Sequence, residues 1–337
     1  MMHLLNRLTL ATALLAFCVV VVGAYVRLSD AGLGCPDWPG CYGHLTVPQN
    51  DSALDHARLA YPDKPLESAK AWKEMTHRYL AGTLGLLVLT IFVMVWRKQR
   101  RISISPALPS LLLLLVILQA LLGMWTVTLL LKPVIVSAHL LGGMTTLALL
   151  SWLAYWRQQP AMPAHPGLAR HEDLRLWARL GLVVVAVQIF LGGWTSSNYA
   201  ALACTDFPTC QGHWLPEMDF ANAFHMVREL GQSADGGQLS LAALTAIHWT
   251  HRLGALLTFF YVGLLALRLM HRHGFGRLGA AMAALLLLQV TLGISNVLFS
   301  LPLPVAVAHN AVAALLLVAL VILNSRMTIT REEGAVP

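Results

Sequence analysis

Two pairs of histidines recur at similar positions in the two halves of the sequence. They are His77 with His251 and His139 with His309. Each lies in the first turns of an apolar stretch, and ionisable residues at membrane depth are costly and usually face the interior of a helix bundle. Two neutral imidazoles from different helices can ligate a six-coordinate haem iron. The sequence therefore predicts one haem site from His77 and His139 and another from His251 and His309.

Two other interpretations compete with haem ligation at these histidines. They could be hydrogen-bonded residues of the helical core, which is the usual role of an isolated histidine within a membrane. Zinc or copper is disfavoured, because each half offers two histidines and structural zinc sites use four ligands. The recurrence of both pairs favours haem.

The neighbours of these histidines add charged groups. Arg78 and Arg252 directly follow the first histidine of each half, and either could pair with haem propionates or extend to lipid headgroups. Glu74 lies three residues before His77 and on the same helical face, whereas its counterpart in the second half is His248, whose role is left open. A carboxyl group near a haem could accept a proton or stabilise positive charge, and a surface carboxylate at a helix start is the alternative. This difference predicts a reactive first half and an electron-carrying second half.

Membrane-spanning helices must position these residues. The chain has 337 residues, of which 57% are hydrophobic and 12% charged, about half of the roughly 25% found in soluble domains. A soluble or a disordered chain is therefore excluded. A bilayer core needs about 20 apolar residues per helix, so we expect an all-α membrane protein with eight transmembrane helices. They lie at approximately 8–27, 72–96, 106–129, 134–156, 174–196, 243–270, 275–298 and 303–325.

The charges between these stretches set the expected orientation. Basic residues, including the cluster at 97–101, gather on the side of the two termini, which the positive-inside tendency assigns to the cytoplasm. The excess of basic residues on the cytoplasmic side explains the net charge of +7. We therefore expect no nucleic-acid partner. The two long loops, at about 28–71 and 197–242, then lie outside.

The cysteines agree with this orientation. Four of the five lie in the two long loops, as the pairs Cys35/Cys41 and Cys204/Cys210. Disulfides persist outside the cytoplasm, so each pair is predicted to close a short disulfide loop, with a structural or a redox role left open. Cys18, within the first apolar stretch, is expected to be a small buried hydrophobic residue.

The two halves of the sequence resemble each other in order. Cys-Pro-Asp-Trp-Pro-Gly-Cys-Tyr-Gly-His at 35–44 matches Cys-Thr-Asp-Phe-Pro-Thr-Cys-Gln-Gly-His at 204–213, and Gln119-x-x-x-Gly123 matches Gln289-x-x-x-Gly293. Ordered matches at a nearly constant separation indicate a duplicated four-helix unit. We predict halves at 1–160 and 161–337, each a four-helix bundle, related by an axis along the membrane normal.

In these features the chain resembles the haem A synthase family. The resemblance rests on the eight spans, the duplicated unit, the Glu-x-x-His-Arg segment at 74–78, the later histidines and the Cys35/Cys41 pair. It implies an oxidoreductase of the bacterial inner (plasma) membrane that oxidises the C8 methyl group of haem O to a formyl group, giving haem A. The cysteine loops would lie on the periplasmic side. The Cys204/Cys210 pair is a departure, because only some members of the family carry it.

The resemblance also implies roles for single residues. His251 and His309, with Arg252, would hold a haem B cofactor. His77 and His139, with Arg78 and Glu74, would receive the haem O substrate. From its chemistry we expect Glu74 to be catalytic, by handling protons or by stabilising a cation at the substrate carbon. Haem O synthase and an electron-transfer partner are expected, and the oligomeric state, a homo-oligomer included, is left open.

Two other functional classes could use the same ligands. A di-haem b-type electron carrier usually places haems near both membrane faces, whereas these histidines lie near one face. A haem transporter or chaperone would use the sites without chemistry, and the asymmetric Glu74 disfavours it. The haems that co-purify with the protein discriminate among the three.

Overall fold

Helices make up the computed structural model, which describes residues 2–102, 105–158, 172–234 and 236–332. Eight helices in this part of the chain are long and apolar enough to cross a membrane, which confirms the predicted all-α membrane architecture. The predicted boundary at 160/161 lies outside the described residues. The elements are α1 (Met2–Leu28), α2 (Asp51–Ala60), α3 (Ser68–Ile102), α4 (Ala107–Thr128), α5 (Pro133–Gln158), α6 (Glu172–Ser197), η2 (Ala200–Leu202), α7 (Phe220–Ala223), α8 (Leu241–Met270), α9 (Gly276–Leu298) and α10 (Leu303–Glu332).

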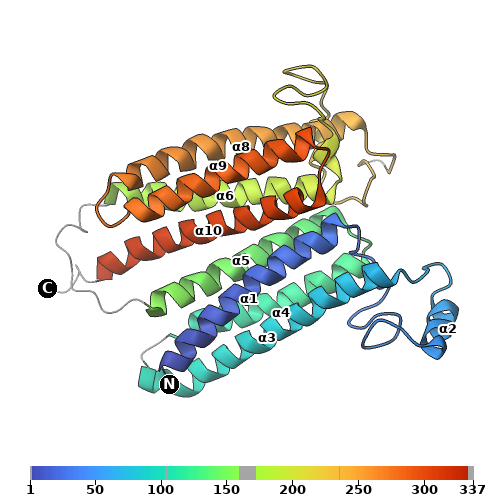
Figure 1. Cartoon of the computed structure of the whole chain (residues 1–337), viewed down its shortest axis with the longest axis horizontal. Coiled ribbons are helices and arrows are strands. Elements are labelled where there is room, and N and C mark those ends of the chain that lie inside the picture. Colours follow the sequence, from blue (N-terminus) through green and yellow to red (C-terminus); the bar gives the residue numbers. More distant parts are fainter. Residues whose placement is uncertain (1, 103–104, 159–171, 235, 333–337) are drawn as a thin grey trace.

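The long helices form two groups of four (Figure 1). One group contains α1, α3, α4 and α5, and the other contains α6, α8, α9 and α10. The groups meet where α5 packs on α6 and α10, and where α1 packs on α10. Helix α1 begins and α10 ends at one end of the bundle, and the long loops lie at the opposite end (Figure 1).

A continuous apolar core joins the two groups. Leu147 and Leu150 of α5 belong to it, together with Leu265 of α8 and Leu320 of α10. Because lipid tails are as apolar as leucine, close packing rather than removal from water stabilises such contacts between membrane helices. The outward faces of the helices are apolar as well, as expected for a bundle surrounded by lipid.

Cys18 lies on one of these outward faces. It is an exposed free cysteine on α1, so the expectation of a buried residue is wrong. Its neighbour one turn earlier, Leu14, is 60% exposed, and a small apolar thiol is as well accommodated by lipid as by a protein core. An apolar run within a membrane helix gives no signal of which face is covered by protein.

Two similar turns position the last helix of each group. The turn before α5 places Leu130 and Leu131 at φ values of +49° and +59°, and the turn before α10 places Ser300 and Leu301 at +54° and +62°. A left-handed conformation after a helix ends it and allows the chain to reverse within a few residues. Helices α5 and α10 therefore start at the same end of the bundle as the long loops.

Helices α3 and α8 start outside their apolar stretches. Helix α3 begins at Ser68, before the predicted start at 72, and α8 begins at Leu241 behind Ser240, whose side chain accepts a hydrogen bond from the N–H of Ala243 at 3.1 Å. A serine in this N-cap position satisfies one of the free N–H groups of the first turn. The first two turns of α3 and α8 thereby reach the disulfide loops, which they contact through Glu74 and His248.

Candidate functional site

The four predicted histidines all lie on long helices, in the part nearer to the long loops. His77 is on α3, His139 on α5, His251 on α8 and His309 on α10, and all four are half-buried. His77 and His139 are close enough to interact electrostatically, and the same holds for His251 and His309. The structure therefore brings together the two pairs that the sequence predicts.

Glycines on the neighbouring helices make room for the imidazoles of the first group. A methyl group built on Gly23 of α1 would lie 2.9 Å from Cε1 of His77, and one built on Gly123 of α4 would lie 3.4 Å from Cε1 of His139. The first distance is shorter than real Cβ contacts, so a side chain at Gly23 would displace the ring. Each ring thus lies directly against the backbone of the adjacent helix.

The second group repeats this arrangement. A methyl group built on Gly192 of α6 would lie 3.2 Å from Cε1 of His251, and one built on Gly293 of α9 would lie 3.1 Å from Cε1 of His309. Both glycines stand at the positions that correspond to the glycines of the first group. The close approach of ring and helix explains why these positions carry glycine.

The Nδ1 atoms of the two groups differ in their hydrogen-bond partners. Nδ1 of His309 lies 3.1 Å from the carbonyl oxygen of Gln289, and Nδ1 of His251 lies 3.1 Å from Nε2 of Gln188. Nδ1 of His77 is buried without a hydrogen-bond partner, whereas His139 meets the backbone of Gln119 as His309 meets that of Gln289. Both imidazoles of the second group are therefore held by neighbouring residues, whereas His77 of the first group has no such partner at Nδ1.

These residues fit an iron porphyrin in the chemistry of their donor atoms. An imidazole that ligates through Nε2 carries its proton on Nδ1, and a carbonyl acceptor such as that of Gln289 fixes this tautomer for His309. Nε2 of His309 then keeps its lone pair, and the side-chain amide of Gln289, at 3.2 Å, would have to move aside for this atom to bind iron. Among the described residues no three histidine, cysteine, aspartate or glutamate side chains gather as they would around a zinc ion.

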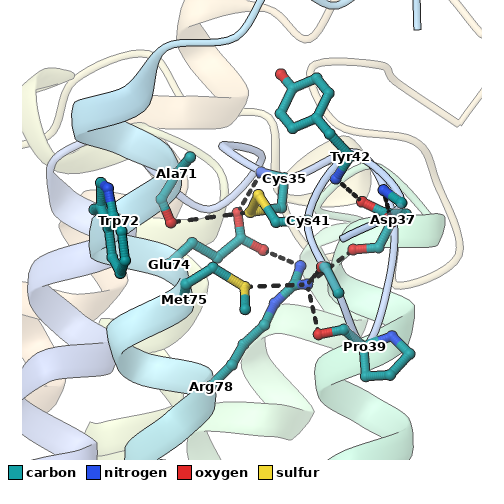
Figure 2. The surroundings of a disulfide bond; sticks show 12 residues. Cys35, Asp37, Pro39, Cys41, Tyr42, Ala71, Trp72, Glu74, Met75 and Arg78 are labelled. Atoms are coloured by element: carbon teal, nitrogen blue, oxygen red, sulfur yellow. Dashed lines mark hydrogen bonds and ion pairs between the residues drawn. A yellow bond between two sulfur atoms is a disulfide. The ribbon is translucent and has the colours of Figure 1, made fainter. Parts of the chain in front are cut away.

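Glu74 lies between α3 and the first disulfide loop (Figure 2). It is 4% exposed, and its Oε2 accepts a hydrogen bond from the N–H of Cys35 at 2.9 Å. Its Oε1 forms an ion pair with Arg78, one turn further along the helix. Cys35 is joined to Cys41, which confirms the first predicted disulfide. The carboxylate thus connects the first turns of α3 to the loop that covers this end of the bundle.

Arg78 holds the same loop through hydrogen bonds to the backbone carbonyl groups of the loop. Its Nη1 donates to the carbonyl oxygens of Asp37, Pro39 and Gly40, at 2.8 Å for Asp37 and 3.3 Å for Pro39. A guanidinium group that satisfies several backbone carbonyls orders a loop that has no secondary structure of its own. The structure gives Arg78 a role in holding the loop, while its pairing with a haem propionate stays a prediction.

The second disulfide loop, closed by Cys204 and Cys210, is held in a corresponding way by His248 and Arg252. The N–H of Cys204 donates to Nδ1 of His248 at 3.3 Å, where Cys35 donates to Glu74 in the first half. Arg252 donates to the carbonyl oxygens of Cys204 at 3.1 Å and of Asp206 at 2.8 Å. Its Nε lies 3.3 Å from Nε2 of His248, and a neutral imidazole can accept a hydrogen bond at only one of its two nitrogens. His248 therefore takes the structural place of Glu74 without its negative charge.

Asp206 closes the second disulfide loop from within. Its carboxylate accepts hydrogen bonds from the hydroxyl of Thr209 and from the N–H groups of Gln211 and Gly212, at 2.6 and 3.0 Å for the two N–H groups. The hydrogen bond from Thr209, with those from the backbone, lowers the pKa of Asp206 to about 2. The loop therefore depends on an ionised carboxylate at every ordinary pH.

Gln188 was not among the residues predicted from the sequence. Its signal is a third Gln-x-x-x-Gly segment, Gln188 to Gly192, beside the two that mark the duplication. In all three segments the glycine lies against one of the four histidines. Comparison of these segments with each other, rather than only across the repeat, would have identified Gln188.

Fold and site together define a multi-pass membrane protein whose two histidine pairs lie near the loop end of two four-helix groups. Residues 6–321 match the model of the COX15-CtaA family, described as cytochrome oxidase assembly protein. The chain therefore belongs to this family. This agrees with the predicted resemblance.

Individual relatives extend the match over nearly the whole chain. A protein of Shewanella oneidensis named "Heme A synthase" is 47% identical over 320 residues, which cover 95% of this chain and 94% of the relative. Proteins with the same name from Caulobacter vibrioides and Halalkalibacterium halodurans are 29% and 26% identical, over 90% and 69% of this chain. The match to the Shewanella oneidensis protein thus spans both disulfide loops and all four histidines.

Proposed function

We infer that this chain is a haem A synthase, a membrane oxidoreductase that converts haem O to haem A. The observation that carries this conclusion is the 47% identity to a relative of that name over 95% of the chain. The paired imidazoles, each lying against a glycine of the next helix, supply the ligands that such an enzyme needs.

We propose that the chain is a duplication with a two-fold axis along the membrane normal. Residues at equivalent positions of the two halves touch only near such an axis. Nη2 of Arg27 donates to the carbonyl oxygen of Ser196 at 2.8 Å, and the hydroxyl of Tyr199 donates to Asp30 at 3.1 Å. Each of these pairs is separated by 169 residues, the separation of the two disulfide segments. The contacts therefore support halves at about 1–160 and 161–337.

Both termini are assigned to the cytoplasm and the disulfide loops to the periplasmic side of the inner membrane. The bias of basic residues toward the end with the termini supports this orientation. The two disulfides support it as well, because the periplasm maintains disulfides that the cytoplasm reduces.

The second half is the place for a resident haem B and the first half for the substrate, haem O. The difference at Nδ1 supports this assignment: His251 and His309 have partners there, whereas His77 has none. Hydrogen-bonded ligands hold a metal more tightly, typically by 10- to 100-fold. A cofactor must stay, whereas a substrate must enter and its product must leave.

Conversion of a methyl to a formyl group removes electrons and protons from one carbon and adds oxygen. A bound haem B would relay electrons between the substrate site and an external partner. Glu74, one turn before His77, is the carboxylate that we assign to proton handling at the substrate methyl group. Arg78 and the N–H of Cys35 hold this carboxylate in place.

The family resemblance adds partners that we propose on that ground alone. Haem O synthase would supply a poorly soluble substrate directly, and an electron-transfer partner would complete the oxidation. Both partners would act at the bilayer, and a homo-oligomer of the chain could also bind them.

Mass spectrometry and absorption spectra of the haems that co-purify with the protein test this function. Wild type should contain haem B together with haem O, haem A or an alcohol intermediate. His309→Ala should lose haem B, and His139→Ala should keep haem B but contain no haem O or haem A. Haem B alone in the wild type, with no conversion of added haem O, would instead indicate an electron carrier. Variable, substoichiometric haem B would indicate a transporter.

A further inference from the structure

Three of the four glycines that face the histidines are preceded by a glutamine one helical turn earlier. These are Gln119 before Gly123, Gln188 before Gly192 and Gln289 before Gly293. The fourth glycine, Gly23, is preceded at the same distance by Val19. The exception belongs to His77, the first histidine of the first half.

Gln188 contacts His251 at two points. Its Nε2 lies 3.1 Å from Nδ1 of the imidazole and also donates to the carbonyl oxygen of His251 at 3.1 Å. Its Oε1 is buried and has no hydrogen-bond partner. A buried amide oxygen without a partner is costly.

Gly254 of α8 makes room for the Gln188 side chain. A methyl group built on Gly254 would lie 2.2 Å from Oε1 of Gln188 and 3.4 Å from its Cδ. Any side chain at this position would therefore displace the carboxamide from His251. A glycine within a helix costs about 1 kcal/mol relative to alanine, so the presence of one here calls for a reason such as this contact.

His77 lacks both members of this arrangement, whereas His139 has its own pair, Gln119 with Gly142. Val19 stands where the second half has Gln188, and Leu80 stands where it has Gly254. An amide and the space that admits it are thus replaced together by two apolar side chains. In agreement with this exchange, Nδ1 of His77 has no hydrogen-bond partner.

We propose that Gln188 is a positioning residue that fixes His251 as a permanent haem ligand, and that Val19 leaves His77 free to exchange its ligand. This inference rests on the proposed function. Rotation of the Gln188 carboxamide by about 180° exchanges its nitrogen and oxygen. Oε1 then accepts the Nδ1 proton of His251, at the loss of the hydrogen bond to the His251 carbonyl. That tautomer leaves Nε2 of His251 for the iron.

The consequence is a difference in ligand strength between the two haem sites. An acceptor at Nδ1 makes an imidazole more basic, which strengthens its bond to iron and favours the ferric state. His251 should therefore hold its haem tightly and at a lower reduction potential than it would without Gln188. His77, without an acceptor, is the weaker ligand, as a site for an exchanging substrate requires.

The test measures the second-half haem alone, in full-length protein that also carries His77→Ala. Gln188→Val introduces the residue of the first half, and Gly254→Ala displaces the amide while leaving Gln188 in the sequence. We expect both variants to retain haem about 10- to 100-fold less well during washing, with a raised midpoint potential and altered low-spin electron paramagnetic resonance signals. Gln188→Glu, which keeps an acceptor, should retain haem and lower the midpoint potential.

Gln119→Val is the matched control. It replaces the same residue type in the first half, where the side-chain nitrogen of Gln119 has no hydrogen-bond partner, so the second-half haem should keep its potential. If Gln188→Val and Gly254→Ala leave retention, potential and spectra unchanged while His251→Ala abolishes the signal, the positioning role is wrong and the haem site stands. If His251→Ala also leaves the signal unchanged, the proposed haem site itself is wrong.

Discussion

Cys35 donates its backbone N–H to the carboxylate of Glu74 at 2.9 Å, so the residue expected to handle protons also anchors the first disulfide loop. In the second half the N–H of Cys204 meets Nδ1 of His248 at 3.3 Å. The two halves thus use the same contact with different chemistry. A neutral imidazole suffices to hold the loop, which leaves the negative charge of Glu74 to be explained by function.

Substitution of Glu74 by histidine separates these two roles. Glu74→His introduces the residue of the second half and should keep the loop in place, whereas Glu74→Gln keeps the shape of the side chain without its charge. Both should bind haem in both sites and form haem A at least about 100-fold more slowly, the range expected for loss of an acid–base group. Haem A is quantified by extraction and chromatography. Haem A production at the wild-type rate by either variant would show that the charge of Glu74 serves no chemical step.

Removal of the arginines should have unequal effects in the two halves. Arg78→Met leaves the buried Glu74 carboxylate without its ion pair, which costs about 3–5 kcal/mol, whereas Arg252→Met removes hydrogen bonds from carbonyls beside a neutral His248, at about 1–3 kcal/mol. The Arg78 variant should therefore show the larger fall in apparent Tm in detergent.

The double variant Arg78→Met with Glu74→Gln provides the control for this comparison. Removal of the unpaired charge should recover part of the lost stability. Equal effects of Arg78→Met and Arg252→Met, with no recovery in the double variant, would mean that Glu74 is not ionised in the folded protein.

The glycine contacts predict a graded response to alanine. Gly23→Ala places a methyl group 2.9 Å from Cε1 of His77 and must displace the ring, whereas Gly123→Ala reaches only ordinary contact with His139 at 3.4 Å. We expect the first variant to lose haem from the first-half site and the second to keep it. Haem content per protein, measured by the pyridine haemochrome method, checks this order, and an equal loss in both variants would contradict it.

The sequence predicted those features that depend only on a single helix and on its burial in the membrane, or on repetition along the chain. Apolar length identified the eight spans, and the recurrence of His77, His139, His251 and His309 identified the pairs that the structure brings together. The disulfides followed from the spacing of the cysteines. Each of these features is set by local sequence or by repetition. None of them depends on how a side chain contacts a distant segment of the chain.

The contacts of Glu74 and Gln188 could not be obtained in this way. Helical spacing places Glu74 on the face of His77, yet the carboxylate turns toward Cys35, 39 residues away, because the loop supplies an N–H there. Gln188 and His251 are 63 residues apart, and their contact depends on the space left by Gly254. Cys18 was misplaced for the related reason that apolar residues suit lipid and protein interior equally.

The carboxylate of Asp206 predicts how the second disulfide loop responds to acid. Its pKa in the folded protein, about 2, is below the ordinary value of 3.8, so its contribution to stability is complete above pH 4 and is lost as the pH falls through about 2. The hydrogen bonds from Thr209, Gln211 and Gly212 lose their ionised acceptor in that range.

Hydrogen exchange of the Gln211 and Gly212 amides, measured between pH 5 and pH 2, tests this expectation. The protection of these amides, relative to the intrinsic exchange rate at each pH, should fall only at the acid end of the range. In Asp206→Asn the same amides should be less protected at every pH, with no step near pH 2, because the charged acceptor is absent throughout. A step that persists in the variant would assign the transition to another group and remove Asp206 as the residue that closes this loop.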